Sequence, residues 1–116
     1  MKKLLDSYLG KNVTVAIDRG EGSLLELNPT GQVLDLLRFA EEGQCLRVVL
    51  EKPVSVVFKD KLLHLNKIVL NPRFVYRRWL HQIIFVEIWS VIKNQDKATF
   101  NPKNEILLAV GELQIQ

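Results

Sequence analysis

The residues best suited to chemistry in this chain are arginines interleaved with aromatic side chains. Residues 73–79 read RFVYRRW, and three lysines precede them from residue 59 onward. Guanidinium groups hold phosphates or carboxylates through paired donors, and aromatic rings stack on nucleic-acid bases. We therefore predict a binding surface within residues 59–79, whose candidate site residues are Lys67, Arg73, Tyr76, Arg77, Arg78 and Trp79.

A structural alternative stays open for the same stretch. Its apolar residues would then belong to the core, and its arginines would form a solvated face. The net charge of +3 favours this alternative, because nucleic-acid-binding domains usually carry a stronger basic bias. The charge is nevertheless uneven: residues 1–58 hold seven Lys/Arg and eight Asp/Glu, whereas residues 59–116 hold nine and five.

Glu87 is the one carboxylate within the apolar residues 82–92. On a strand it would face the same way as Phe85 and Trp89. Desolvation there would favour the neutral acid unless a cation met it, and such a carboxyl group is a candidate acid or base. We favour the structural interpretation, an ion pair with an arginine such as Arg47, Arg77 or Arg78.

The other reactive residue types form no catalytic pattern. His64 and His81 are seventeen residues apart, and metal ligands come in oriented sets that this spacing does not require. Cys45 begins an apolar run, where a buried cysteine is common. Phosphate-loop, nucleophile-elbow, zinc-protease and calcium-loop motifs are missing from the sequence. We predict that the chain is not an enzyme, holds no metal and uses no cofactor.

Length and composition predict a single folded domain over residues 1–116. Hydrophobic residues make up 47% and charged residues 25%, which excludes a disordered chain. The single cysteine favours a reducing, cytoplasmic location. The N-terminus begins like a signal peptide, but Asp6 interrupts it and no cleavage site follows. Residues 82–92 are too short a run to span a membrane, so we expect no membrane partner.

Strands are the elements predicted to position most of these residues. Alternating apolar residues with short connections favour antiparallel strands near 12–17, 46–51, 54–58 and 62–70. Residues 82–92 predict a central strand that is apolar on both faces, because β-branched and aromatic residues dominate it. We place residues 73–79 in a surface loop or helical turn that meets this strand at His81.

Two helices complete the prediction. An amphipathic set near the N-terminus, closed by Gly10, predicts a short helix. The second helix lies near 31–42 and is followed by Gly43; its apolar face is Val33, Leu36, Leu37 and Ala40. Residues 72–81 and 105–110 are compatible with either helix or strand. The predicted fold class is α+β, with a mainly antiparallel sheet or barrel of about six strands, one short N-terminal helix and one helix near 31–42.

The segment LLDSYLGKNVTVAI is similar to the opening of the Sm-like barrels, in which a short helix leads into a Gly-Lys-x-Val-x-Val strand. The similarity covers fourteen residues. The second half of the chain lacks the glycine-containing motif of that family, and the helix predicted near 31–42 would interrupt its strands. We therefore assign no family from this segment.

These observations favour a small, non-catalytic interaction domain that self-associates into a homo-oligomer. The sequence has more apolar strand than a small domain needs, and symmetric homo-oligomers are the commonest assemblies. The alternative is a nucleic-acid-binding domain that uses the basic, aromatic stretch 59–79. An acidic protein is a further partner that this stretch would fit.

Overall fold

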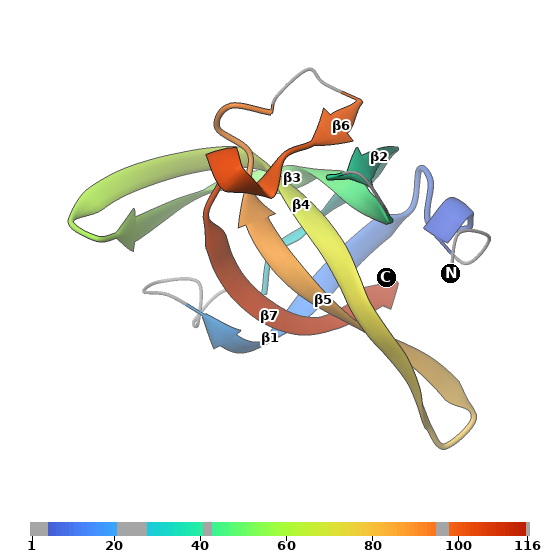
Figure 1. Ribbon diagram of the computed structural model, residues 1–116. Helices are drawn as coiled ribbons and strands as arrows, with labels where there is room; N and C mark the ends of the chain where they lie inside the picture. The colour runs from blue at the N-terminus through green and yellow to red at the C-terminus, as the bar shows by residue number, and fades with distance from the viewer. Residues whose placement is uncertain (1–4, 21–27, 41–42, 95–97, 116) are drawn as a thin grey trace.

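The computed structural model describes residues 5–20, 28–40, 43–94 and 98–115, and this part of the chain is nearly all strand. Seven strands form one sheet in the order β1-β7-β5-β4-β3-β2-β6 (Figure 1). The strands are β1 (Asn12–Gly20), β2 (Thr30–Phe39), β3 (Gln44–Phe58), β4 (Lys61–Arg78), β5 (His81–Ser90), β6 (Thr99–Phe100) and β7 (Leu107–Ile115). A 3₁₀ helix, η2 (Pro102–Asn104), precedes β7.

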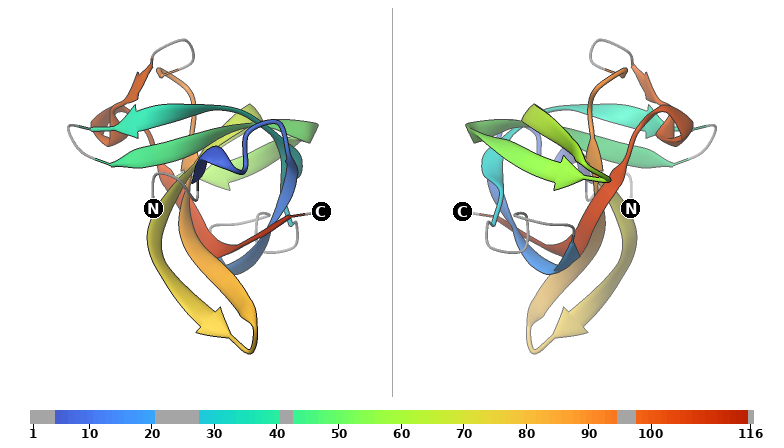
Figure 2. Two further views of the ribbon diagram at one scale, coloured as in Figure 1. Left: turned by 90° about the vertical axis from the view of Figure 1, so that its right-hand side faces the viewer. Right: turned by 90° about the vertical axis from the view of Figure 1, so that its left-hand side faces the viewer.

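An additional pairing between β1 and β2 closes the sheet on itself. Both views in Figure 2 show strands curving around a common interior. Neighbouring strands are antiparallel except for β2 and β6. Two glycines let neighbouring strands pack closely, β2 against β3 and β7 against β1. A Cβ on Gly31 would lie 2.2 Å from the Val49 carbonyl oxygen, and one on Gly111 would lie 2.3 Å from the Ala16 carbonyl oxygen. Any larger residue would push these strands apart.

The main core fills the interior of the closed sheet. Its side chains come from alternate positions of the strands, and Leu5 and Tyr8 join them from the N-terminal turn. A second, smaller cluster lies on the opposite face of the sheet. It is built by Leu37, Cys45 and Val69 on β2, β3 and β4, by Val91 just after β5, and by Phe100 of β6. The sheet is therefore buried on both faces near β6 and on one face elsewhere.

The predicted α+β class is wrong, because residues 31–40 do not form a helix. They lie largely in β2, and residues 41–42 of the predicted helix lie outside the described residues. A register shift between Val33 and Asp35 interrupts the alternation of β2, so the inward-facing Val33 and Leu36 are three residues apart, as on a helix. Leu37 is buried in the second cluster on the other face. The apolar spacing that predicted a helix is therefore the product of a β-bulge and two buried faces.

The N-terminal helix is reduced to one turn in the described residues. Leu5 and Asp6 are helical, and the Tyr8 backbone N–H donates to the Leu5 carbonyl over 3.0 Å. Gly10 ends the turn with φ +74°, while residues 1–4 of the predicted helix lie outside the described residues. No helix in the described part of the chain is long and apolar enough to cross a membrane.

The strand predictions hold in position but not in length. Residues 46–51 and 54–58 belong to the single strand β3, and β4 runs on from the predicted 62–70 to Arg78. β5 lies between β4 and β7, which confirms a central strand, although its outer face is only half-buried. Residues 72–78 are strand, so the surface loop or helical turn predicted at 73–79 is wrong. In the segment 105–110, the residues from 107 onward are strand.

Candidate interaction surface on the β4–β5 hairpin

The ends of β4 and β5 extend beyond the rest of the sheet as a hairpin. β3 pairs with β4 only as far as Leu70, and β7 pairs with β5 only from Ile84 onward. We call residues 73–83 the β4–β5 arm. It is the hairpin that projects toward the lower right of Figure 1. The arm contains most of the residues predicted from the sequence to form a binding surface.

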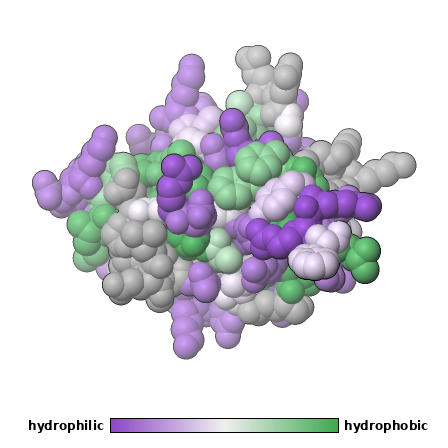
Figure 3. Space-filling model, turned by 90° about the horizontal axis from the view of Figure 1, so that it is seen from below, coloured by the Kyte–Doolittle hydropathy of each residue, from purple (hydrophilic) through white to green (hydrophobic). Residues whose placement is uncertain are grey.

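The end of the arm exposes two large apolar side chains. Trp79 and Leu80 form the two-residue loop, and they are 91% and 93% exposed. In Figure 3, which views the molecule from below, strongly hydrophilic side chains lie beside pale and hydrophobic ones on the right, where the arm points. An exposed apolar pair rimmed by charges is typical of a contact site rather than of an ordinary surface loop.

The backbone at the end of the arm does not explain the choice of tryptophan. Trp79 has φ +61°, a conformation that favours glycine or asparagine and is costly for a bulky side chain. The β3–β4 hairpin also has a two-residue loop, but both of its residues, the charged Lys59 and Asp60, have positive φ. A small or polar residue would suit the Trp79 position better, so the backbone alone gives no reason for a tryptophan there.

One carboxylate organises the outer face of the arm. Glu112 on β7 accepts hydrogen bonds from the Tyr76 hydroxyl and from Arg78, whose Nη2 lies 2.6 Å from Oε1. The Tyr76 hydrogen bond, followed by that of Arg78, holds the pKa of Glu112 below its ordinary value, and the same Glu112 bond raises the pKa of Tyr76. These contacts tie β4 to β7 across β5.

A second carboxylate, Glu87, lies on the same face. It accepts from the Asn71 side-chain amide over 2.9 Å and from the Trp89 indole over 3.2 Å. Its ion pair is with Arg73, at 3.8 Å. The predicted arginine pair is therefore present, but with none of the three arginines named for it. Arg47 instead donates to Asp35, with Nε 2.9 Å from Oδ1.

Aromatic rings cover the surface between the two carboxylates. The Phe74 ring stacks on Phe85, with centroids 4.9 Å apart, and lies 5.9 Å from the Tyr76 ring. Phe74 remains about half exposed. We did not predict Phe74, Phe85 or Glu112 as site residues. The alternation of Phe74, Tyr76 and Arg78 along one strand would have indicated their common face, had this segment been assigned to a strand.

The structure brings together only some of the predicted site residues. Arg73, Tyr76 and Arg78 lie on the outer face of the arm, and Trp79 lies at its end. Arg77 lies on the opposite face, because successive strand residues alternate. Lys67 belongs to the part of β4 that pairs with β3, where it lines a hollow with His64, Asn66 and Val91. The predicted surface 59–79 is thus not continuous.

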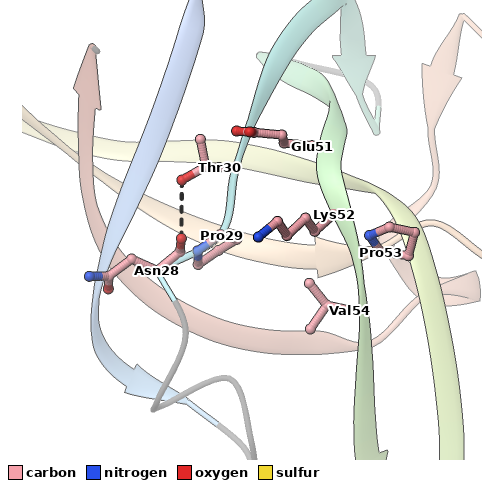
Figure 4. A pocket seen from close by; sticks show the side chains of 7 residues that line it. All are labelled: Asn28, Pro29, Thr30, Glu51, Lys52, Pro53 and Val54. Carbon is pink, nitrogen blue, oxygen red and sulfur yellow. Dashed lines mark hydrogen bonds between the residues drawn. The ribbon is translucent and has the colours of Figure 1, made fainter.

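A further hollow and further reactive groups lie away from the arm in the described part of the chain. A surface hollow lies between the start of β2 and the middle of β3, lined by Asn28, Pro29, Thr30, Glu51, Lys52, Pro53 and Val54 (Figure 4). Its two charged side chains are both exposed. Among the described residues, no three His, Cys, Asp or Glu side chains are placed to hold a metal ion. Burial raises the pKa of the Cys45 thiol to about 12, which makes it a poor nucleophile.

Glu105 is the most highly hydrogen-bonded carboxylate in the described part of the chain, and its role is structural. Its oxygens accept five hydrogen bonds from the turn that follows β5, three of them from the backbone N–H groups of Ile92, Lys93 and Asn94. The other two come from the side chains of Ser90 and Asn94. The carboxylate closes this turn in the way that a cap closes a helix end.

The sequence matches no protein-family model and no curated protein, and the structure matches no solved structure.

Proposed function

We propose that this protein is a non-catalytic interaction module and that the β4–β5 arm is its main contact element. The observation that carries this proposal is the exposure of Trp79 and Leu80 on a hairpin that projects from the closed sheet. Tryptophan and arginine are enriched at protein contacts and contribute most of their binding energy. The arm presents both residue types side by side.

The charges of the arm support binding rather than catalysis. Glu87 and Glu112 accept hydrogen bonds from neighbouring strands and keep arginines in place. A general acid or base would instead face a cavity in which a substrate could lie. Neither carboxylate lines any of the four surface hollows that we identified among the described residues. The cytoplasmic location expected from the single cysteine is part of the proposal.

Self-association also belongs to the proposal, and the β3–β4 hairpin is its candidate contact. Val57 and Leu62 lie opposite each other across this hairpin and are both more than half exposed. We expect light scattering to give a mass above that of the 13.4 kDa monomer, and Leu62→Lys to lower it. Leu34→Lys, on β2 and 51% exposed, is the matched control. A monomer mass for the parent up to about millimolar concentration, where weak interfaces are populated, would refute self-association.

Nucleic-acid binding is the second candidate function. The observation that favours it is the exposed ring of Trp79 beside Arg77 and Arg78, which resembles a stacking platform with phosphate-binding groups. The ion pairs of Arg73 and Arg78 argue against nucleic-acid binding, because carboxylates already occupy those two guanidinium groups. Purification without nuclease tests it: a raised ratio of absorbance at 260 nm to that at 280 nm would support nucleic-acid binding.

The contact role of the arm is tested by capture with matched variants. The double variant Trp79→Ser/Leu80→Ser should lose proteins that the parent retains from a cell lysate. Val57→Ser/Leu62→Ser makes the same kind of change on the other hairpin and should retain them. If both variants capture the same proteins as the parent, the arm is not the contact element and the proposal fails.

A further inference from the structure

The arm has an open backbone edge. From Asn71 to Arg78, β5 is the only strand that pairs with β4 in the part of the chain that the structure describes. The backbone groups on the other side of β4 are therefore free of strand partners over this stretch. Pro72 lies at its start, where a residue without an N–H group is tolerated because the strand has become an edge.

The hairpin geometry shows which backbone groups face this edge. Arg78 and His81 flank a two-residue loop, so they form a hydrogen-bonded pair. Hydrogen-bonded and non-hydrogen-bonded pairs alternate along antiparallel strands, so the next bonded pair is Tyr76 with Ile83.

It follows that Val75 and Arg77, which belong to the non-bonded pairs with β5, direct both of their backbone groups away from β5. Each residue therefore places one backbone donor and one backbone acceptor along the open edge. The side chains of the two residues lie on the same face of β4. An edge of this kind is a template for an added strand.

Charge decides what kind of strand fits. If a second copy paired antiparallel about Arg77, the Arg77 side chains of the two copies would lie opposite each other, and like charges directly opposite each other destabilise a sheet. Charged edge residues are a common device against such self-pairing. Arg73 and Arg78 are paired with Glu87 and Glu112, but we find no ion pair for Arg77 among the described residues, and the arm has no acidic residue of its own. An acidic strand would be attracted where a second copy is repelled.

We propose that the open edge of β4 over residues 71–78 binds an extended, acidic segment of another protein by strand addition. This inference rests on the proposed function and names its partner class. In an antiparallel added strand, residues opposite Arg77 and Val75 share their face, so carboxylates there meet the Arg77 guanidinium. The intervening residues of the added strand lie on the face of Phe74 and Tyr76, where their apolar side chains cover the half-exposed Phe74 ring. The preferred segment alternates acidic and apolar residues.

A labelled peptide of alternating valine and glutamate, with blocked termini, is a suitable probe, and its binding is read by fluorescence anisotropy. Methylation of the glutamate backbone nitrogens removes the donors that face β4, whereas methylation of the valine nitrogens removes donors on the far side. The two modified peptides have the same charge. We expect the parent peptide and the valine-methylated peptide to bind alike, and the glutamate-methylated peptide to bind at least about tenfold more weakly, since several backbone hydrogen bonds are lost.

A pair of protein variants gives the reciprocal test. Arg77→Pro and Arg77→Gln remove the same charge, but only the proline removes the N–H group at the open edge. Arg77→Pro should bind the peptide at least about fivefold more weakly than Arg77→Gln, the loss of about one hydrogen bond. If Arg77→Pro does not fold, the methylated peptides still decide the question.

Three outcomes would overturn the inference: no binding of the parent peptide up to about millimolar concentration, equal binding of both methylated peptides, or binding of an eight-nucleotide oligothymidylate in place of the peptide. The capture experiment with Trp79→Ser/Leu80→Ser separates this failure from that of the proposed function. If capture depends on the arm and the peptide does not bind, the arm is a contact element for another class of partner.

Discussion

The guanidinium of Arg78 on β4 lies 2.6 Å from the carboxylate of Glu112 on β7, on the far side of β5. This contact connects the outer end of the arm, next to its loop, to the closed sheet. Arg77, the next residue along the chain, lies on the opposite face of β4, and we find no ion pair for it among the described residues. Two adjacent arginines therefore have different roles, one structural and one available to a partner.

This difference predicts different effects of the same substitution. Arg78→Gln should lower the melting temperature slightly, as expected for the loss of a partly exposed ion pair, and Arg77→Gln should leave it unchanged. Thermal unfolding followed by circular dichroism measures both. Equal melting temperatures for the two variants would show that the Arg78 contact does not support the fold.

The carboxylate of Glu112 predicts a dependence of stability on pH. Its pKa is held below the ordinary value in the folded state, first by Tyr76 and then by Arg78. The folded state therefore binds the proton less readily than the unfolded state, so the contribution is complete above the ordinary pKa of about 4.3 and is lost as the pH falls below it. Between about pH 5 and about pH 3, which bracket the titration of this carboxyl group, the melting temperature of Glu112→Gln should fall less steeply than that of the parent. Parallel curves would contradict the assignment.

Glu105 predicts a larger loss of stability. In Glu105→Gln an amide group replaces an oxygen that accepts backbone N–H groups, so at least two of the five hydrogen bonds are lost. We expect a loss of about 2–3 kcal/mol and a melting temperature lower by roughly 10 °C. Glu51→Gln, at an exposed position of β3, is the control. A shift no larger than that of the control would mean that the turn after β5 does not need the carboxylate.

Trp79 predicts a conflict between stability and binding. Trp79→Gly should raise the free energy of unfolding by about 1 kcal/mol, because glycine adopts the positive φ of this position without strain. The same variant should lose the partner proteins that the parent captures. Leu80→Gly has no positive φ to relieve and should not gain stability. A destabilised Trp79→Gly would show that the tryptophan supports the fold.

The sequence predicted the regular strands well because their alternation reflects burial on one face. Val13 and Val15 in β1 are buried as their spacing indicates, and Ile84, Val86 and Ile88 from the apolar run 82–92 are buried in β5. β2 was missed because its bulge shifts the alternation after Val33. No local pattern distinguishes a bulged strand from an amphipathic helix of the same length.

The arm was missed for a different reason. One face of its β4 strand carries Phe74, Tyr76 and Arg78, and the other carries only Val75 before the exposed Arg77, so no apolar periodicity marks it as a strand. The partners of its side chains are also remote: Glu112 is 36 residues from Tyr76 along the chain, and this contact depends on the order of β4, β5 and β7. Pro72 does not decide between the alternatives, because proline is suited both to a helix start and to an edge strand.

Residue-resolved amide hydrogen exchange tests most directly the central claim, that β4 presents an open edge on a projecting arm. The N–H groups of Val75 and Arg77 should exchange rapidly, because they face solvent, while the N–H group of Tyr76 between them should be protected by its bond to β5. Such a difference between neighbouring residues would confirm the edge. Protection of Val75 and Arg77 equal to that of Tyr76 would show that the edge is already covered, and would contradict both the open edge and the strand-addition inference.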